Sequence, residues 1–178
     1  IAQRHRTAKP ACLVELTRHK QYSACPNCGE KLRKIEMSSE EKASIRESLM
    51  DLARKNDHFE SLRAFSEFLE SRMQKNNGNQ IMYIVDGANV AYYGLGTVNY
   101  HQIEQMVASL EERGENPLVV IPQKYTQKKF WLRQGYVQEL PEDQMQIMEN
   151  LNATGRMYIV PHRCLDDYYW MLSSVSDQ

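Results

Sequence analysis

Apolar residues from position 81 onwards form two kinds of pattern. Continuous apolar runs, rich in β-branched and aromatic residues, predict three strands buried on both faces, at 81–85, 118–121 and 157–160. Apolar residues that recur every three or four positions predict helices over about 100–113 and 141–151, and a further helix that begins at Asp166. This alternation indicates an α/β fold in which right-handed crossovers join the strands of a parallel sheet flanked by helices.

The part of the sequence before residue 81 lacks such strand patterns. Apolar residues at helical spacing predict two helices, over 38–55 and about 58–74, whose apolar stripes we expect to be core rather than a partner surface. Asparagine and glycine at 76–79 predict a linker after them. We therefore expect a basic irregular region, a helical connector and a main domain, over 1–37, 38–78 and 79–178.

The charge of the chain is informative through its distribution. The sequence has 178 residues and a formal net charge of −1, which by itself gives no argument for binding nucleic acid. Residues 1–35, however, hold eight Lys and Arg against two Glu, and residues 122–136 hold four cations and no acid. Such asymmetry can make a polyanion-binding face on a neutral protein, although solvated surface is the simpler interpretation of any single charge run.

The cations of the second basic segment are interleaved with aromatic residues. Cations neutralise phosphates and aromatic rings stack on bases, so we expect this segment to contact RNA. The alternative is an exposed helix face whose aromatic residues belong to the core. The candidate RNA-binding residues are Lys124, Lys128, Lys129 and Arg133.

Two of the four cysteines form a C-x-x-C motif. Cys25 and Cys28 have the spacing and the Pro/Gly-containing turn of a knuckle that holds one side of a tetrahedral Zn²⁺. A redox pair or two unrelated cysteines are the alternatives. A structural site needs two further ligands, for which the sequence offers Cys12, His19, His58, His162 and Cys164.

Acidic residues follow two of the predicted strands. Asp86 directly follows the first strand, and Asp166 and Asp167 follow the third after a short loop. Because parallel strands end at the same edge of a sheet, these carboxylates are expected to gather there, where Mg²⁺ or Mn²⁺ relieves their repulsion and can support phosphodiester hydrolysis. Asn89 is a further candidate ligand. The alternatives are a turn at Asp86 and helix capping by Asp166 and Asp167.

Three motifs in this order resemble the protein-only RNase P (proteinaceous RNase P, PRORP) family. They are Val85-Asp86-Gly87-Ala88-Asn89-Val90, the upstream Cys-x-x-Cys-Gly-Glu knuckle, and Asp166-Asp167-Tyr168-Tyr169-Trp170. The resemblance covers about residues 20–178. It implies a PIN/NYN-like Rossmannoid metallonuclease domain with a small zinc-knuckle region on its N-terminal side.

The resemblance implies a function and a set of roles. The activity would be endonucleolytic removal of the 5′ leader of precursor tRNA by water activated with Mg²⁺. By the same resemblance, Asp86, Asp166 and Asp167 match catalytic metal-binding aspartates, and Cys25 and Cys28 match two ligands of a structural zinc. The family pattern continues into a further active-site aspartate and into a His and a Cys that complete the zinc site. The sequence ends at Gln178 before these residues, so we expect either an excerpt of a longer chain or an inactive one, and the initial Ile1 also favours a fragment.

Three functions remain open from the sequence. They are the tRNA-processing nuclease, another NYN-type endoribonuclease acting on messenger or structured RNA, and a non-catalytic RNA-binding or partner-dependent module. Precursor tRNA is the expected partner, with protein subunits if the chain is of the partner-dependent type. The sequence contains no stretch apolar enough to span a membrane. We expect an intracellular location, mitochondrial ahead of other organelles or the nucleus.

Overall fold

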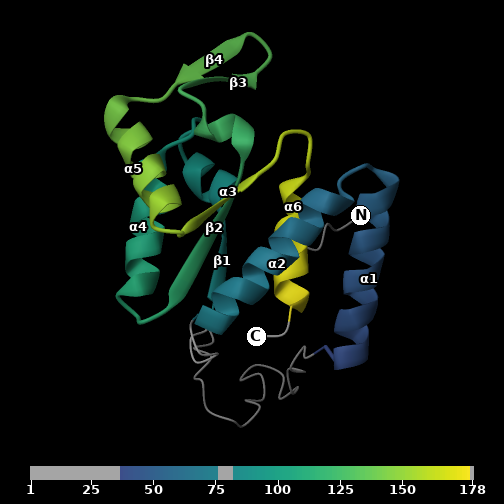
Figure 1. Cartoon of the computed structure of the whole chain (residues 1–178). Helices are drawn as coiled ribbons and strands as arrows, with labels where there is room; N and C mark the ends of the chain where they lie inside the picture. The colour runs from purple at the N-terminus through teal and green to yellow at the C-terminus, as the bar shows by residue number, and fades with distance from the viewer. Residues whose placement is uncertain (1–36, 76–81, 177–178) are drawn as a thin grey trace, which may run out of the picture. The chain divides into compact units, whose positions relative to one another are not determined.

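A computed structural model describes residues 37–75 and 82–176 (Figure 1). The helices are α1 (Ser39–Lys55), α2 (Phe59–Lys75), α3 (Gly87–Tyr92), α4 (Tyr100–Glu111), α5 (Glu142–Ala153) and α6 (Asp166–Val175), with a 3₁₀ turn η1 (Gln123–Thr126). The strands are β1 (Met82–Asp86), β2 (Asn116–Pro122), β3 (Lys129–Arg133), β4 (Tyr136–Glu139) and β5 (Met157–Val160). Cys25 and Cys28 lie outside the described residues.

The three strands predicted from apolar runs form one parallel sheet. Their order is β1-β2-β5, so β2 is central, with Asp86 of β1 in register with Val120 and Val160 of β5 in register with Pro122. The prediction of a parallel α/β sheet flanked by helices is confirmed. Since all three strands run the same way, their carboxyl ends meet at one edge of the sheet.

Both faces of the sheet are covered by helices, as the apolar runs predict. Val119 and Ile121 of β2 face a core that α4 and α5 complete, while Leu118 and Val120 face a second core. The second core takes its other residues from β5 and from α1, α2 and α6. Figure 1 shows α4 and α5 on one side of the sheet and α6 on the other. The apolar stripes of the two N-terminal helices therefore contribute to the core, as expected, except at Leu52 of α1, which is 42% exposed.

Two segments differ from the sequence-based expectation. Residues 87–92, which follow the turn considered at Asp86, form the short helix α3 because Asp86 caps their first turn. The interpretation of the cations at 124–133 as an exposed helix face is wrong, since this segment forms η1 and then an antiparallel hairpin of β3 and β4. Gly135, with φ of 77°, supplies the left-handed conformation in the hairpin turn.

Candidate active site at the carboxyl edge of the sheet

The carboxyl ends of the three parallel strands bring the predicted catalytic residues to one edge. Strand β1 ends at Asp86, and β2 leads directly into η1, which carries Lys124. Strand β5 leads through a five-residue loop into α6, whose first two residues are Asp166 and Asp167. The placement of acids after β1 and β5, on either side of the central strand, is as the sequence predicts.

Asp86 is fixed in place by its hydrogen bonds to Asn89. One carboxylate oxygen of Asp86 accepts a hydrogen bond from the backbone N–H of Asn89 at 3.0 Å, and the other accepts from the Asn89 side-chain amide at 2.6 Å. Asp86 is therefore the N-cap of α3. An ionised carboxylate has about four lone-pair sites, so capping leaves acceptor capacity for a further partner.

Gly87 is required by close packing. It is the first residue of α3, and a Cβ atom at this position would lie 2.8 Å from Cγ1 of Val119 and 3.1 Å from the carbonyl oxygen of Val120. The absence of a side chain lets α3 approach β2, which sets the position of Asp86 at the edge.

Asp166 has a raised pKa in the site. Its side chain is half-buried, and burial is the main cause that raises its pKa above the ordinary value of an aspartate. The negative charges of Asp86 and Asp167 raise the pKa of Asp166 further, while Lys124 and a backbone hydrogen bond act in the opposite direction. Asp86, Asp167 and Lys124 therefore all lie within electrostatic reach of Asp166.

The first turn of α6 allows a second role for its two acids. The N-cap residue is Leu165, whose side chain has no polar atom to cap the helix, so Asp166 and Asp167 occupy the first helical turn rather than the cap. Negative charge in the first turn of a helix interacts favourably with the helix dipole. Asp167 is exposed, so it contributes to this end of the helix without being buried in the site.

The donor chemistry of this edge fits a hard divalent cation. In the described ranges 37–75 and 82–176, no group of three His, Cys, Asp or Glu side chains comes close enough to hold one metal ion. Protein-bound Mg²⁺ often uses only one or two carboxylates and completes its coordination with water and substrate phosphate. Asp86 and Asp166, which lie within electrostatic reach of each other at this edge, would supply the carboxylates of such a site. Ligation by Asp167 and Asn89 stays a prediction.

The four cations predicted to bind RNA have different surroundings. The positive charge of Lys124 lowers the pKa of Asp166, against the effect of burial. The Nζ atom of Lys124 is 4.4 Å from the centroid of the Tyr125 ring. Lys128 and Lys129 pair with Glu142 and Glu139 at 3.7 and 3.1 Å, and Arg133 lies over the ring of Tyr136. The structure thus associates Lys124 with the acidic edge and the other three with the hairpin.

Sequence reasoning missed a residue that links two parts of the edge. Gln123, the first residue of η1, accepts a hydrogen bond from the backbone N–H of His162 through Oε1 at 3.0 Å. This bond ties the segment that carries Lys124 to the loop that precedes α6. Only its position directly after a strand distinguishes Gln123 in the sequence. His58, His162 and Cys164, considered above as zinc ligands, belong to no three-ligand group among the described residues.

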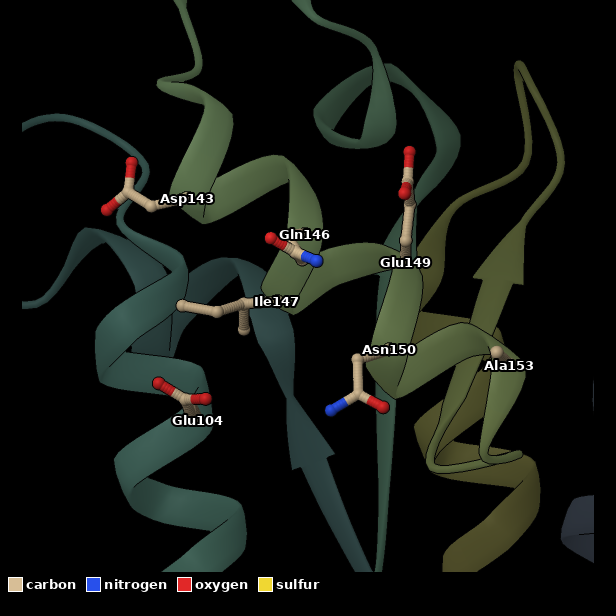
Figure 2. A pocket seen from close by; sticks show the side chains of 7 residues that line it. All are labelled: Glu104, Asp143, Gln146, Ile147, Glu149, Asn150 and Ala153. Atoms are coloured by element: carbon tan, nitrogen blue, oxygen red, sulfur yellow. The ribbon is translucent and has the colours of Figure 1, made fainter.

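A pocket between α4 and α5 is distinct from the acidic edge (Figure 2). It includes none of the predicted site residues, and its polar lining contains three acids. An acidic surface repels the phosphates of RNA, so this pocket does not fit the function expected of the chain. Its lining residues are Glu104, Asp143, Gln146, Ile147, Glu149, Asn150 and Ala153.

Comparison with solved structures finds the same fold in a plant enzyme. The chain is similar to the crystal structure of nuclear proteinaceous RNase P 2 (PRORP2) from Arabidopsis thaliana, with a TM-score of 0.60 and 24% identity over 86% of this chain and 30% of that one. A second PRORP2 structure from the same plant gives a TM-score of 0.59 and 23% identity over 85% and 30% of the two chains. The chain thus spans about a third of the length of these structures.

Sequence comparisons give no further assignment. No protein-family model matches the chain, and no curated protein matches it. The likeness to PRORP2 therefore supports the fold alone. No helix among the described residues is both long and apolar enough to cross a bilayer.

Proposed function

We propose that the chain is the nuclease part of a protein-only RNase P, which removes the 5′ leader of precursor tRNA with Mg²⁺ or Mn²⁺. The observation that carries this proposal is the convergence of Asp86 and Asp166, from opposite sides of the central strand, in a fold similar to that of PRORP2. A coupled carboxylate pair at the carboxyl edge of a parallel sheet is suited to holding a divalent cation against a phosphodiester.

The roles of the individual residues follow from their surroundings. Asp86 and Asp166 would hold the metal, and Asn89 would keep the Asp86 carboxylate oriented through its 2.6 Å hydrogen bond. When bound, the metal supplies an activated water and stabilises charge on the leaving oxygen. Lys124, the cation nearest in electrostatic terms to Asp166, would hold the scissile phosphate against the edge. Gln123 would position Lys124 through its contact with the β5–α6 loop.

The remaining expectations are part of the same proposal. Asp167 would contribute to the metal site from the exposed side of the first turn of α6. Cys25 and Cys28 would supply two ligands of a structural Zn²⁺, and the hairpin cations would contact the RNA. The protein would act inside the cell, in mitochondria ahead of other organelles or the nucleus. Protein subunits are further partners if the chain needs them for activity.

A second candidate function is a non-catalytic RNA-binding module. The observation that favours it is that Asp86 already caps α3, while the described residues bring no three acids together around one point. In that case Asp166 and Asp167 act only by stabilising the N-terminal end of α6 through the helix dipole. The two functions differ in whether a divalent metal is needed for cleavage.

Cleavage of a 5′-extended precursor tRNA tests the proposal. The protein would be incubated with the RNA and Mg²⁺, and the product ends would be mapped. We expect a mature tRNA with a 5′-phosphate and a leader with a 3′-hydroxyl. Asp86→Asn and Asp166→Asn should lose this cleavage. Asp51→Asn, on α1 and outside the edge, is their matched control and should cleave normally. Cleavage at other positions would favour a general NYN-type ribonuclease, and tRNA binding without cleavage would favour the non-catalytic module.

A further inference from the structure

The β3–β4 hairpin exposes a large aromatic residue beside cations. Trp131 is 68% exposed and lies directly opposite Val137 in the antiparallel pair. Lys129 and Arg133, two residues before and after Trp131 on β3, are also exposed, whereas Phe130 between them is buried. Alternation places Lys129, Trp131 and Val137 on one outward-facing surface, and Arg133, which pairs with Tyr136 beyond a register shift after Trp131, is exposed next to it at the turn end of β3. We call these four residues the hairpin outer face.

The opposite face of the hairpin is anchored to the domain. Phe130 is 4% exposed, and its ring meets that of Tyr125 edge to face, with the centroids 5.4 Å apart. Gln138, which is 9% exposed, accepts a hydrogen bond from the backbone N–H of Val98 at 2.9 Å and donates one to its carbonyl at 2.6 Å. A two-stranded hairpin alone is marginally stable in water, so these contacts hold the outer face in a fixed position.

The anchoring residues also connect the hairpin with the acidic edge. The Tyr125 ring that contacts Phe130 also contacts Tyr92 of α3, with a centroid distance of 5.7 Å. Tyr125 belongs to η1, as does Lys124, and β3 begins three residues after η1 ends. The hairpin outer face is therefore attached to the segment that borders Asp166.

The charge around the hairpin outer face favours a polyanionic ligand. Residues 123–138 contain four Lys and Arg and no Asp or Glu. Glu139 of β4 pairs with Lys129 at 3.1 Å, while Arg133 lies over the Tyr136 ring with its guanidinium carbon 5.7 Å from the centroid. Proteins bind unpaired nucleic acid by combining backbone-tracking cations with aromatic rings on which bases stack. A flat exposed tryptophan between cations has both of these features.

We propose that the hairpin outer face binds an unpaired segment of RNA, with one base stacked on Trp131 and the neighbouring phosphates held by Lys129 and Arg133. The choice of RNA as the ligand rests on the proposed function, which this inference extends from the acidic edge to a second contact on the same substrate. Duplex RNA, whose bases are covered by their neighbours, would not make the stacking contact.

Tryptophan fluorescence in EDTA tests this contact without cleavage. Trp131 and Trp170 are the two tryptophans of the sequence, so Trp170→Phe leaves Trp131 as the single reporter. We expect a 12-nucleotide oligouridylate to quench its emission in a saturable manner, and a 12-base-pair RNA duplex to quench it far less. Binding by each protein is measured in parallel from the anisotropy of a fluorescein label on the RNA.

Substitutions at the hairpin separate stacking from charge. Trp131→Leu keeps an apolar side chain without an aromatic face and should weaken oligouridylate binding about 5- to 150-fold, whereas Trp131→Phe should lose less. Arg133→Ala should weaken binding and reduce its salt dependence. Arg113→Ala, which removes an exposed cation at the end of α4, is the control and should bind as the parent does.

Three results would overturn the inference. They are equal binding by Trp131→Leu and the parent, unchanged Trp131 emission while anisotropy reports bound RNA, and equal quenching by duplex and single strand. Equal binding by Trp131→Leu would make a protein the better candidate for this surface. If the parent cleaves precursor tRNA but these tests fail, the inference alone is wrong. If they succeed and no divalent metal supports cleavage, the nuclease function alone is wrong.

Discussion

Asp86 and Asp166 are coupled across the central strand of the sheet, although 80 positions separate them in the sequence. Asp86 ends β1, Asp166 begins α6 after β5, and the charge of Asp86 acts on the half-buried carboxyl of Asp166. Burial is the first cause of the raised pKa of Asp166, with Asp86 and Asp167 adding to it. The ionised form of Asp166 is therefore disfavoured unless a cation lies beside it.

Replacing Asp86 by Asn should lower the pKa of Asp166 towards its ordinary value. The neutral amide removes one of the repelling charges, while burial continues to raise the pKa. Carboxyl ¹³C chemical shifts of Asp166, followed through a pH titration in EDTA, measure the change directly. Asp51→Asn should leave the titration of Asp166 as it is. An unchanged pKa of Asp166 in Asp86→Asn would contradict the coupling.

The same shift gives a pH dependence of stability. Because the folded pKa of Asp166 is above its unfolded value, the stability that this group contributes is fully present below the unfolded pKa and is lost as pH rises through the folded pKa. Asp166→Asn carries no charge at any pH. In EDTA its free energy of unfolding should therefore improve relative to the parent as pH rises through that range, as measured by urea denaturation. A difference that is constant with pH would argue against the assignment.

Gly87→Ala should destabilise the domain because the new Cβ meets Val119 and the backbone of β2. Overpacking of this kind costs about 1–3 kcal/mol in the free energy of unfolding. Val119→Ala removes the nearest methyl group, so the double variant should be less destabilised than the sum of the two single variants. If urea denaturation shows that the changes in the free energy of unfolding of the two single variants simply add in the double variant, the new Cβ of Gly87→Ala does not press on Val119.

The metal site should be detectable without RNA. Electron paramagnetic resonance counts free Mn²⁺ in a titration, and the parent should bind the ion. Asp86→Asn and Asp166→Asn should each weaken binding by roughly tenfold or more, and Asn89→Ala should also weaken it because the Asp86 carboxylate loses its orienting hydrogen bond. Asp51→Asn should bind normally. Equal affinity in all variants would remove these residues from the site.

Gln138→Leu should loosen the hairpin. The substitution leaves the N–H and the carbonyl of Val98 without their side-chain partner, at about 1–3 kcal/mol for each buried group left unpaired. Amide hydrogen exchange should rise at Val98 and along β3 and β4 more than in β1, β2 and β5. A uniform rise across the domain would instead indicate that the hairpin and the sheet unfold together.

The sequence predicts the sheet well because its strands are decided by local composition. Runs such as Leu118–Ile121 are apolar at every position, and only a strand covered on both faces buries all of them. The hairpin was harder to predict because β4 buries Gln138, a polar residue that is satisfied only by a backbone 40 positions away. Helix α3 was missed because an aspartate followed by glycine is compatible with both a turn and a helix cap.

For the candidate site, the sequence predicts the edge of the sheet at which Asp86 and Asp166 lie, but not the contacts that position them there. Topology alone brings Asp86 and Asp166 to one edge, since parallel strands end together. How closely their carboxylates approach depends on Gly87 packing against β2 and on the loop that Gln123 holds. Neither contact has a local signal in the sequence. The exposure of Trp131 follows from hairpin packing and was likewise not readable from the pattern.

The central claim is that Asp86 and Asp166 act as one catalytic unit on RNA, and a double-mutant cycle tests it most directly. Single-turnover cleavage of precursor tRNA with Mg²⁺ would be measured for the parent, Asp86→Asn, Asp166→Asn and the double variant, with tRNA binding checked for each. We expect each single variant to lose on the order of 10³-fold or more in rate and the double variant to lose little beyond that. Normal cleavage by either single variant, or losses that simply multiply, would contradict the account.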